Sequence, residues 1–283
     1  MASAGGPGNG FLMSSFLETA GLVFIVAYLL FGIDDLVVDI IAWARGLRAR
    51  QLGAIEWRKI RSLPEKRFAI LVANWHEEEI LERVVRGNLA RIHYKNYRIY
   101  LGVYPNDGAT LRVAEALASE NPRVKVIVNS RNGPTSKGQL ENYCHDHEQT
   151  KKKRPEVLLF HDSEDAIHPL SLRLLNAHVE KSELVQVPVF SFLRPGFDLV
   201  GGTYMDEFAE SHLKDMHVRS ALGAGLPLAG VGIACKTSLA ERIISQTGRF
   251  LNEASLTEDY DLGLRAGRLG VRAKFLAVYR VVK

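Results

Sequence analysis

Hydrophobic positions along this chain follow three patterns, each of which predicts a different kind of element. Residues 11–33 form one long apolar run that is interrupted by a single charge at Glu18. From Phe68 onward, short apolar runs typical of buried parallel strands alternate with stretches in which apolar residues recur every three or four positions, as in helices. Such alternation predicts an α/β fold with a doubly wound, mainly parallel sheet.

Each predicted element has its own range in the alternating part of the chain. The strands are predicted at Phe68–Ala73, Tyr97–Tyr104, Val124–Val128, Val157–Phe160, Leu184–Phe190 and Lys274–Val281. The helices are predicted at Glu77–His93, Thr110–Ser119, Lys137–His147, Leu170–Val179 and Thr203–Lys214. The regularity breaks beyond Pro195, where residues 223–232 hold four glycines. A loop so rich in glycine permits close approach of a ligand or of another backbone.

The apolar run at 11–33 is long enough to cross a bilayer, which takes about 20 residues. No Lys or Arg precedes it, so it does not resemble a cleavable signal peptide. Basic residues follow it, and this bias predicts that the C-terminal part lies in the cytoplasm. They are Arg45, Arg48, Arg50, Arg58, Lys59, Arg61, Lys66 and Arg67. A helix buried in a soluble core is the alternative.

The chain therefore divides into three predicted parts: a flexible N-terminus at 1–10, a membrane helix with a basic interfacial segment at 11–62, and a globular domain at 63–283. With 283 residues, 24% of them charged, the chain is long enough for a sizeable core. The net charge of +4 comes with no recognition motif for nucleic acid, and the basic run 151–154 is predicted to be a solvated loop. Two cysteines, Cys144 and Cys235, imply no disulfide framework.

Three carboxylates, Asp162, Glu164 and Asp165, follow the predicted strand Val157–Phe160. A strand end is where an α/β sheet presents side chains to a ligand crevice. Like charges this close repel each other, but a divalent cation between them removes the penalty, and Mg²⁺ is usually held by one or two carboxylates together with substrate phosphates. The pattern predicts a metal–diphosphate site at Asp162 and Glu164. The alternative is an acidic turn that caps the helix after Pro169.

A second acidic group lies in residues 255–261. Ser255 and Glu258 have the spacing of a capping box, so these acids could simply complement a helix N-terminus. Asp259, on the first turn of the same helix, could instead be a general base at the mouth of the metal site. The two interpretations are compatible if Glu258 caps the helix and Asp259 is catalytic.

Two further sets of residues, a Cys/His cluster and Lys137, are weaker candidates for ligand binding. The segment 144–147 contains Cys144, His145 and His147, but the two histidines stand two positions apart on a predicted helix and point away from each other. The spacings of zinc ligands are absent there. Lys137 follows the loop 133–136, and it is either a surface lysine or a point charge for a diphosphate.

In this order and spacing, the motifs resemble those of the inverting family 2 glycosyltransferases with the GT-A fold, in the branch that contains processive membrane polysaccharide synthases. The resemblance extends from about residue 20 to the last residue. The segments that carry it are Gly32-Ile33-Asp34-Asp35, Tyr104-Pro105-Asn106-Asp107, Gly133-Pro134-Thr135-Ser136-Lys137, His161-Asp162-Ser163-Glu164-Asp165, Tyr204-Met205-Asp206-Glu207-Phe208 and Leu256-Thr257-Glu258-Asp259-Tyr260-Asp261.

This resemblance implies a nucleotide-diphospho-sugar donor and a Mg²⁺ or Mn²⁺ cofactor. In the donor site, Glu77 and Asp107 would contact the nucleoside. Lys137 would lie near the diphosphate, beside Asp162. A UDP-N-acetylhexosamine is the donor that the resemblance suggests.

The same resemblance assigns the metal and the chemistry. Asp162 and Glu164 match the Asp-x-Asp metal motif, while Glu258 and Asp259 match the Thr-Glu-Asp motif that carries the catalytic base. The reaction would be one in-line displacement, in which the metal stabilises the leaving diphosphate. The enzyme would be a hexosyltransferase of the bacterial inner membrane with a cytoplasmic catalytic domain. Its partners would be the sugar donor, a glycan acceptor, the lipid bilayer and an export partner, but no nucleic acid.

Several positions depart from the family pattern. Asn106 stands where most members have the first Asp of an Asp-Asp-Gly turn, Glu164 replaces the second Asp of the metal motif, and His76 occupies a position that is often Asn. The sequence ends at Lys283 without a Gln-x-x-Arg-Trp motif or later apolar spans, so the domain is predicted to be C-terminally incomplete. Two alternatives therefore stay open: a non-catalytic membrane component or docking platform that keeps the fold, and a nucleotidyltransferase.

Overall fold

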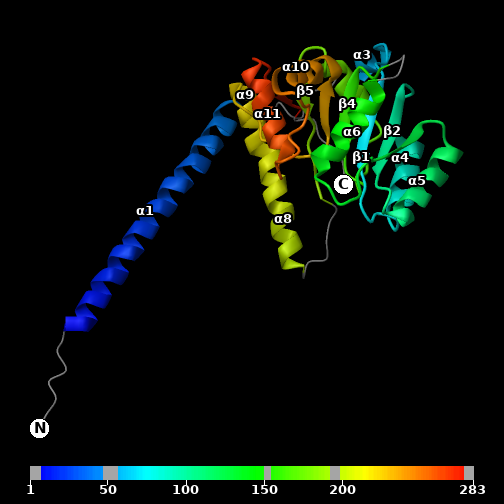
Figure 1. The fold of residues 1–283 in the computed structure, drawn as a ribbon. Coiled ribbons are helices and arrows are strands. Elements are labelled where there is room, and N and C mark those ends of the chain that lie inside the picture. The colour runs from blue at the N-terminus through cyan, green and yellow to red at the C-terminus, as the bar shows by residue number, and fades with distance from the viewer. Residues whose placement is uncertain (1–7, 47–56, 150–153, 192–197, 277–283) are drawn as a thin grey trace, which may run out of the picture. The chain divides into compact units, whose positions relative to one another are not determined.

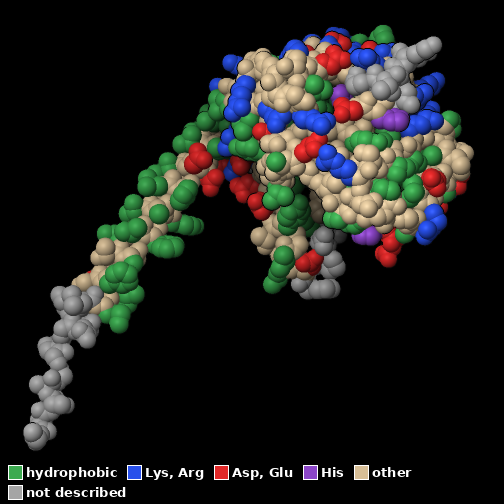
Figure 2. All heavy atoms as spheres, viewed as in Figure 1, with side chains coloured by type: hydrophobic (Ala, Val, Ile, Leu, Met, Phe, Trp, Pro, Cys, Tyr) green, Lys and Arg blue, Asp and Glu red, His purple; other side chains and the backbone are tan. Residues whose placement is uncertain are grey.

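The computed structural model describes residues 8–46, 57–149, 154–191 and 198–276, and the chain forms two compact units, Met1–Arg48 and Ala49–Lys283. The first unit is built on α1 (Gly8–Ala44), a helix of 37 residues. Its segment Met13–Ala44 is apolar and long enough to cross a membrane. Hydrophobic side chains cover its surface (Figure 2) instead of packing into a core, which disfavours the alternative of a buried core helix.

This helix begins earlier than predicted and, as predicted, extends beyond the apolar run. It starts at Gly8, inside the segment predicted to be flexible, and it continues past Ile33 through Asp34 and Asp35. Part of the basic segment that follows it, at 47–56 with Arg48 and Arg50, lies outside the described residues, as do the lysines at 151–153.

The second unit is an α/β domain around a seven-stranded sheet of order β3-β2-β1-β4-β6-β5-β7 (Figure 1). All neighbouring strands run parallel except β6, which is antiparallel to both β4 and β5. The strands are β1 (Phe68–Ala73), β2 (Tyr97–Val103), β3 (Val124–Val128), β4 (Val157–His161), β5 (Leu184–Gln186), β6 (Ile233–Lys236) and β7 (Lys274–Phe275). The mainly parallel sheet confirms the predicted fold class, although β5 is shorter than predicted and β6 was not predicted at all.

Helices cover both faces of this sheet. They are α3 (Trp57–Ser62), α4 (Leu81–Arg91), α5 (Gly108–Glu120), α6 (Lys137–Gln149), α7 (Ser171–His178), α8 (Leu199–Glu210), α9 (Met216–Leu222), α10 (Thr237–Thr247) and α11 (Glu258–Arg268). A π-helical turn, η1 (Ser211–Asp215), joins α8 to α9. The amphipathic helix predicted at 203–214 differs in its bounds: it starts at Leu199 and changes to π geometry at Ser211.

Two apolar cores hold the layers together, one on each face of the sheet. Successive strand residues point to opposite faces, so Ile70 packs with residues of α4, α5 and α7, while Leu71 packs with residues of α6, α10 and α11. Each is fully buried, and burial of a side chain of this size contributes about 2 kcal/mol.

The strand directions decide which segments meet. Parallel β1, β2 and β4 present their carboxyl ends at one edge of the sheet. Because β6 runs the other way, the glycine-rich loop that precedes it ends at this same edge, where the amide of Gly232 donates to the carbonyl of Phe160 at 2.8 Å. Residues far apart in the sequence therefore converge there.

Candidate active site

The nucleoside side of the predicted donor site forms where β1 and β2 end. Asp107 caps α5 by accepting from the amide of Thr110, and its other carboxylate oxygen accepts from the amide of His76 at 2.7 Å. Burial opposes ionisation of Asp107, but these hydrogen bonds outweigh it and hold its pKa below the ordinary value. Glu77 belongs to the β1–α4 connection, because α4 begins only at Leu81 and not at Glu77 as predicted.

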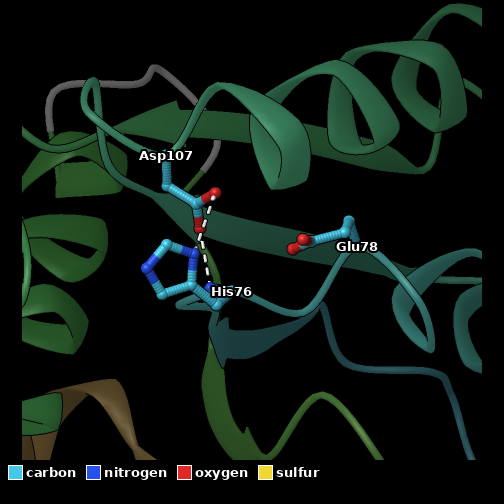
Figure 3. Close-up of side chains that lie close together, drawn as sticks. All are labelled: His76, Glu78 and Asp107. Atoms are coloured by element: carbon cyan, nitrogen blue, oxygen red, sulfur yellow. Dashed lines mark hydrogen bonds and ion pairs between the residues drawn. The ribbon is translucent and has the colours of Figure 1, made fainter.

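His76, Glu78 and Asp107 lie close together (Figure 3), and their ligand atoms are within 4.8 Å of one another, as in a metal site. Two of these side chains already have hydrogen-bond partners: Asp107 as described, and Glu78, which accepts from the hydroxyl of Thr110 at 3.2 Å. His76 has a left-handed backbone with φ of 57°, which is uncommon for a residue other than glycine. Glu78 was not predicted from the sequence, although three consecutive glutamates at 77–79 were a signal for it.

The hydrogen bonds of Asn106 explain why asparagine stands here in place of the aspartate that most family members have. Its side-chain amide donates to the carbonyl of Gly133 at 2.8 Å, and its side-chain oxygen accepts from the amide of Gly133 at 2.7 Å. An aspartate could only accept. The asparagine therefore ties the β2 turn to the loop that leads to Lys137.

Lys137, the first residue of α6, lies at the centre of the site. Its ammonium is 2.5 Å from an oxygen of Asp162 and donates to the carbonyl of Gly230 at 3.1 Å. Burial lowers its pKa, but the charges of Glu141 and Asp162 outweigh burial and raise it. The lysine is therefore held as a cation among carboxylates.

Two buried residues, His161 and Asp165, hold Asp162 in position. Asp165 accepts from the amide of Asp162 at 3.1 Å and is hydrogen-bonded to Nδ1 of His161 at 2.9 Å. Ser163 is fixed in the same turn because its hydroxyl donates to Asn74 at 3.0 Å. The carboxylate of Asp162 is left partly exposed, at 36%.

The predicted metal pair has the right donor chemistry for a divalent cation. Glu164 is exposed beside the partly exposed Asp162. Burial raises the pKa of the nearby Glu77, and the charges of Glu164 and Asp162 raise it further. Such mutual repulsion among oxygen donors is what a bound Mg²⁺ or Mn²⁺ would relieve.

The second acidic group reaches the same place from α11. A methyl group on Gly230 would lie 3.3 Å from an oxygen of Asp259 and 3.8 Å from the ammonium of Lys137. Burial raises the pKa of Asp259, with the charge of Lys137 acting against it and that of Asp162 adding to it. Glu258 is buried, and burial raises its pKa too. The structure thus brings Asp162, Lys137 and Asp259 together around one glycine.

The predicted capping box is wrong. The residue that precedes α11 is Thr257, which makes no side-chain capping bond. The hydroxyl of Ser255 instead accepts from the amide of Thr257 at 3.2 Å, within the loop. Glu258 is the first residue of the helix, and its side chain lies against Gly138 of α6 instead of turning back to Ser255.

Glu141 is a second site residue that was not predicted from the sequence. It lies on α6, is only 3% exposed, and one of its oxygens has no hydrogen-bond partner among the described residues, with Lys137 at 4.0 Å. It lines a cavity of about 10 Å³ with Gly230, Glu258 and Asp259, which is room for about one water molecule. Burial raises the pKa of Glu141 to about 8.

Comparisons with known proteins agree on one family. A profile described as glycosyltransferase like family 2 matches residues 64–283. The chain is 33% identical over 270 residues to bacteriophage adsorption protein B of Escherichia coli K12, an alignment that covers 92% of the chain and 36% of that protein. The same values hold for bacteriophage N4 adsorption protein B of E. coli O157:H7. The chain thus spans about a third of the length of these relatives.

Solved structures show the same fold at low identity. The mannosyltransferase PcManGT from Pyrobaculum calidifontis, in complex with GDP-Man and Mn²⁺, matches with a TM-score of 0.56 and 17% identity, over 87% of this chain and 67% of that one. TarS 1–349 of S. aureus in complex with UDP-GlcNAc matches with a TM-score of 0.52 and 16% identity, over 77% and 58% of the two chains. These likenesses confirm the predicted GT-A fold.

Proposed function

Because this chain belongs to glycosyltransferase family 2, we propose that it transfers a sugar from a nucleotide-diphospho-sugar to a glycan acceptor, with inversion at the anomeric carbon. The observation that carries this proposal is the convergence of Asp162, Lys137 and Asp259 around Gly230. These residues come from three separate elements, and together they offer an anion-binding cation, a metal-binding carboxylate and a base.

Donor binding uses the residues at the carboxyl ends of β1, β2 and β4. Asp107, kept ionised by its hydrogen bonds, accepts hydrogen bonds from the nucleoside together with Glu77. Lys137 supplies a positive charge to the diphosphate, exchanging its contact with Asp162 for phosphate oxygens. UDP-N-acetylhexosamine is the donor that we propose, because a UDP-GlcNAc complex is among the structural relatives.

The divalent cation would be held by Asp162 and Glu164. When bound, it supplies positive charge that stabilises the leaving diphosphate. The pair formed by His161 and Asp165 keeps Asp162 directed into the site through the amide hydrogen bond. Support for a metal also comes from the relative PcManGT, whose structure contains Mn²⁺.

Asp259 is the proposed general base. A single in-line displacement needs a group that removes the proton of the attacking hydroxyl. The raised pKa of Asp259 makes this carboxylate a better proton acceptor than an exposed aspartate. Glu258 lies buried against α6 and fixes the first turn of α11, so it positions Asp259.

The domain is anchored, in this proposal, by α1 in the bacterial inner membrane, with the site on the cytoplasmic side. The basic residues that follow α1 favour this orientation. A glycan acceptor and an export partner complete the proposed system.

The test measures donor binding and transfer separately, on the full chain in a neutral detergent. UDP with Mn²⁺ should raise the melting temperature through ligand-linked stabilisation. Asp162→Ala should remove most of this shift, whereas Glu115→Ala, at an exposed acid of α5, should leave it unchanged. Asp259→Asn should keep the shift but abolish sugar transfer.

Two outcomes would contradict the proposal in different ways. If no nucleoside diphosphate shifts the melting temperature with Mn²⁺, the donor site is wrong. If the wild-type protein binds UDP-sugars but transfers none to any acceptor in membranes of the source cells, the non-catalytic platform is the better description.

A further inference from the structure

A large cavity lies at the opposite edge of the sheet from the candidate active site. Its volume is about 840 Å³, within the range of small-molecule pockets. It is lined by residues at the amino ends of β1, β2, β3 and β4, including Phe68 and Tyr97. Strands of five to seven residues, rising about 3.3 Å each, separate the two sites by roughly 20 Å.

Five cationic side chains line this cavity: Arg67, Lys95, Arg98, Arg123 and Arg154. Two of them have acidic partners, because Arg67 lies 3.3 Å from Glu156 and Arg154 lies 3.5 Å from Glu241. Within the described part of the chain, Lys95, Arg98 and Arg123 make no ion pair. The cavity therefore carries uncompensated positive charge.

A buried hydroxyl adds a second, independent observation. Tyr97 is 4% exposed and lines the cavity, and no acceptor for its buried hydroxyl proton lies within hydrogen-bond distance among the described residues. The guanidinium of Arg123 lies 5.2 Å from the centre of the Tyr97 ring, and its charge and hydrogen bond act against the rise in the Tyr97 pKa that burial causes. A buried donor without an acceptor is destabilising, and a bound acceptor would remove this penalty.

We propose that this cavity is a second ligand site that binds a phosphate-bearing anion, which pairs with Lys95, Arg98 and Arg123 and accepts a hydrogen bond from Tyr97. Arginine in particular matches phosphate oxygens with two parallel hydrogen bonds. The phosphate has two sources. One is a soluble phosphate compound, and the other is the headgroup of an anionic phospholipid, since the sequence connects α1 to this edge of the domain through α3 and Arg67.

Hydrogen–deuterium exchange of the full chain resolves where an anion binds. One arm adds inorganic pyrophosphate to the protein in a neutral detergent. The other compares nanodiscs of phosphatidylcholine alone with nanodiscs of phosphatidylcholine and phosphatidylglycerol in equal parts. Slower exchange at residues 95–100 and 121–124 is expected in one of these arms, and the arm that shows it identifies the source. Slower exchange confined to residues 104–110 and 137–141 would report the donor site alone and would overturn the proposal.

The variants make the assignment specific. Lys95→Gln, Arg98→Gln and Arg123→Gln together should weaken binding about 100-fold. Arg83→Gln, Arg219→Gln and Arg268→Gln, which remove the same charge from exposed positions elsewhere, should leave it unchanged. Equal binding by the two triple variants would show unspecific attraction and refute a built site.

A milder variant guards against misfolding of the triple variant. Tyr97→Phe removes only the buried hydroxyl, so it should fold at least as well as the wild type while binding about tenfold more weakly. If Tyr97→Phe binds the anion as tightly as the wild type, the hydroxyl of Tyr97 does not contribute to the site. Because the exchange of the donor-site peptides is read separately, this proposal can fail while the proposed glycosyltransferase activity stands.

Discussion

Glu141→Gln should remove part of the pH dependence of the domain's stability. The folded protein holds this carboxyl group protonated up to a pKa of about 8, whereas the unfolded chain releases the proton near 4.5. Between these values folding takes up a proton, so the free energy of unfolding falls as the pH rises. The contribution of Glu141 to stability is therefore complete in acid and is lost on approach to pH 8.

The magnitude follows from the size of the pKa shift. A rise from 4.5 to about 8, at 1.36 kcal/mol for each unit, amounts to about 5 kcal/mol at most. Relaxation around the ionised group and entry of water reduce this, so we expect about 2–4 kcal/mol. Because glutamine is neutral at every pH, Glu141→Gln should match the wild type at pH 5 and exceed it at pH 8. For a domain of this size, the difference corresponds to a melting temperature higher by about 5–15 °C.

Thermal unfolding of the full chain in neutral detergent, followed by near-ultraviolet circular dichroism from pH 5 to pH 8, measures this difference. Burial also raises the pKa of Glu258 and Asp259, so both proteins should lose stability as the pH rises, and only the gap between their curves reports Glu141. Glu115→Gln, on the exposed face of α5, should run parallel to the wild type. If the Glu141→Gln curve is also parallel to the wild type, the reasoning from burial is refuted.

Two further substitutions test other parts of the site. Asp165→Ala removes the acceptor of both the Asp162 amide and His161. The substitution should lower the free energy of unfolding by about 2–4 kcal/mol and weaken Mn²⁺-dependent UDP binding about tenfold. Titration calorimetry measures the binding, and Asp165→Asn should recover part of it. Unimpaired UDP binding in Asp165→Ala would show that Asp162 needs no such support. Ser255→Ala should change the free energy of unfolding by less than about 0.5 kcal/mol, because Ser255 does not cap α11. A measured loss of about 1 kcal/mol or more would show that Ser255 does cap the helix.

The sequence predicted the parts of the fold that are locally encoded. β1 and β3 were predicted with their observed bounds because each is a compact apolar run between polar segments. β6 was missed because its four residues, Ile233–Lys236, are too few to show a period. Its antiparallel pairing with β4 depends on a segment more than 70 residues away.

The candidate site was predicted where acids follow strands and missed where polar residues are buried on a helix. Asp162 comes directly after a strand-like run, which the sequence shows, whereas Asp107 was assigned from the family resemblance. Glu141 lies in α6, whose residues Gln139, Asn142 and His145 are also buried. A polar residue on a helix looks the same in sequence whether it faces water or the interior, so no period revealed it. The basic cavity was missed because its cations are scattered from Arg67 to Arg154.

The reversed direction of β6 has a consequence for the design of chimeras. The side chains proposed to hold the donor all precede Asp165, while Gly230 and Asp259 arrive from the other end of the chain across the β4–β6 boundary. The two halves of the crevice therefore come from separate stretches of the chain that meet where Lys137 donates to the carbonyl of Gly230. If the proposed roles are right, a chimera joined near residue 200 should change the acceptor that is used while nucleotide binding stays the same.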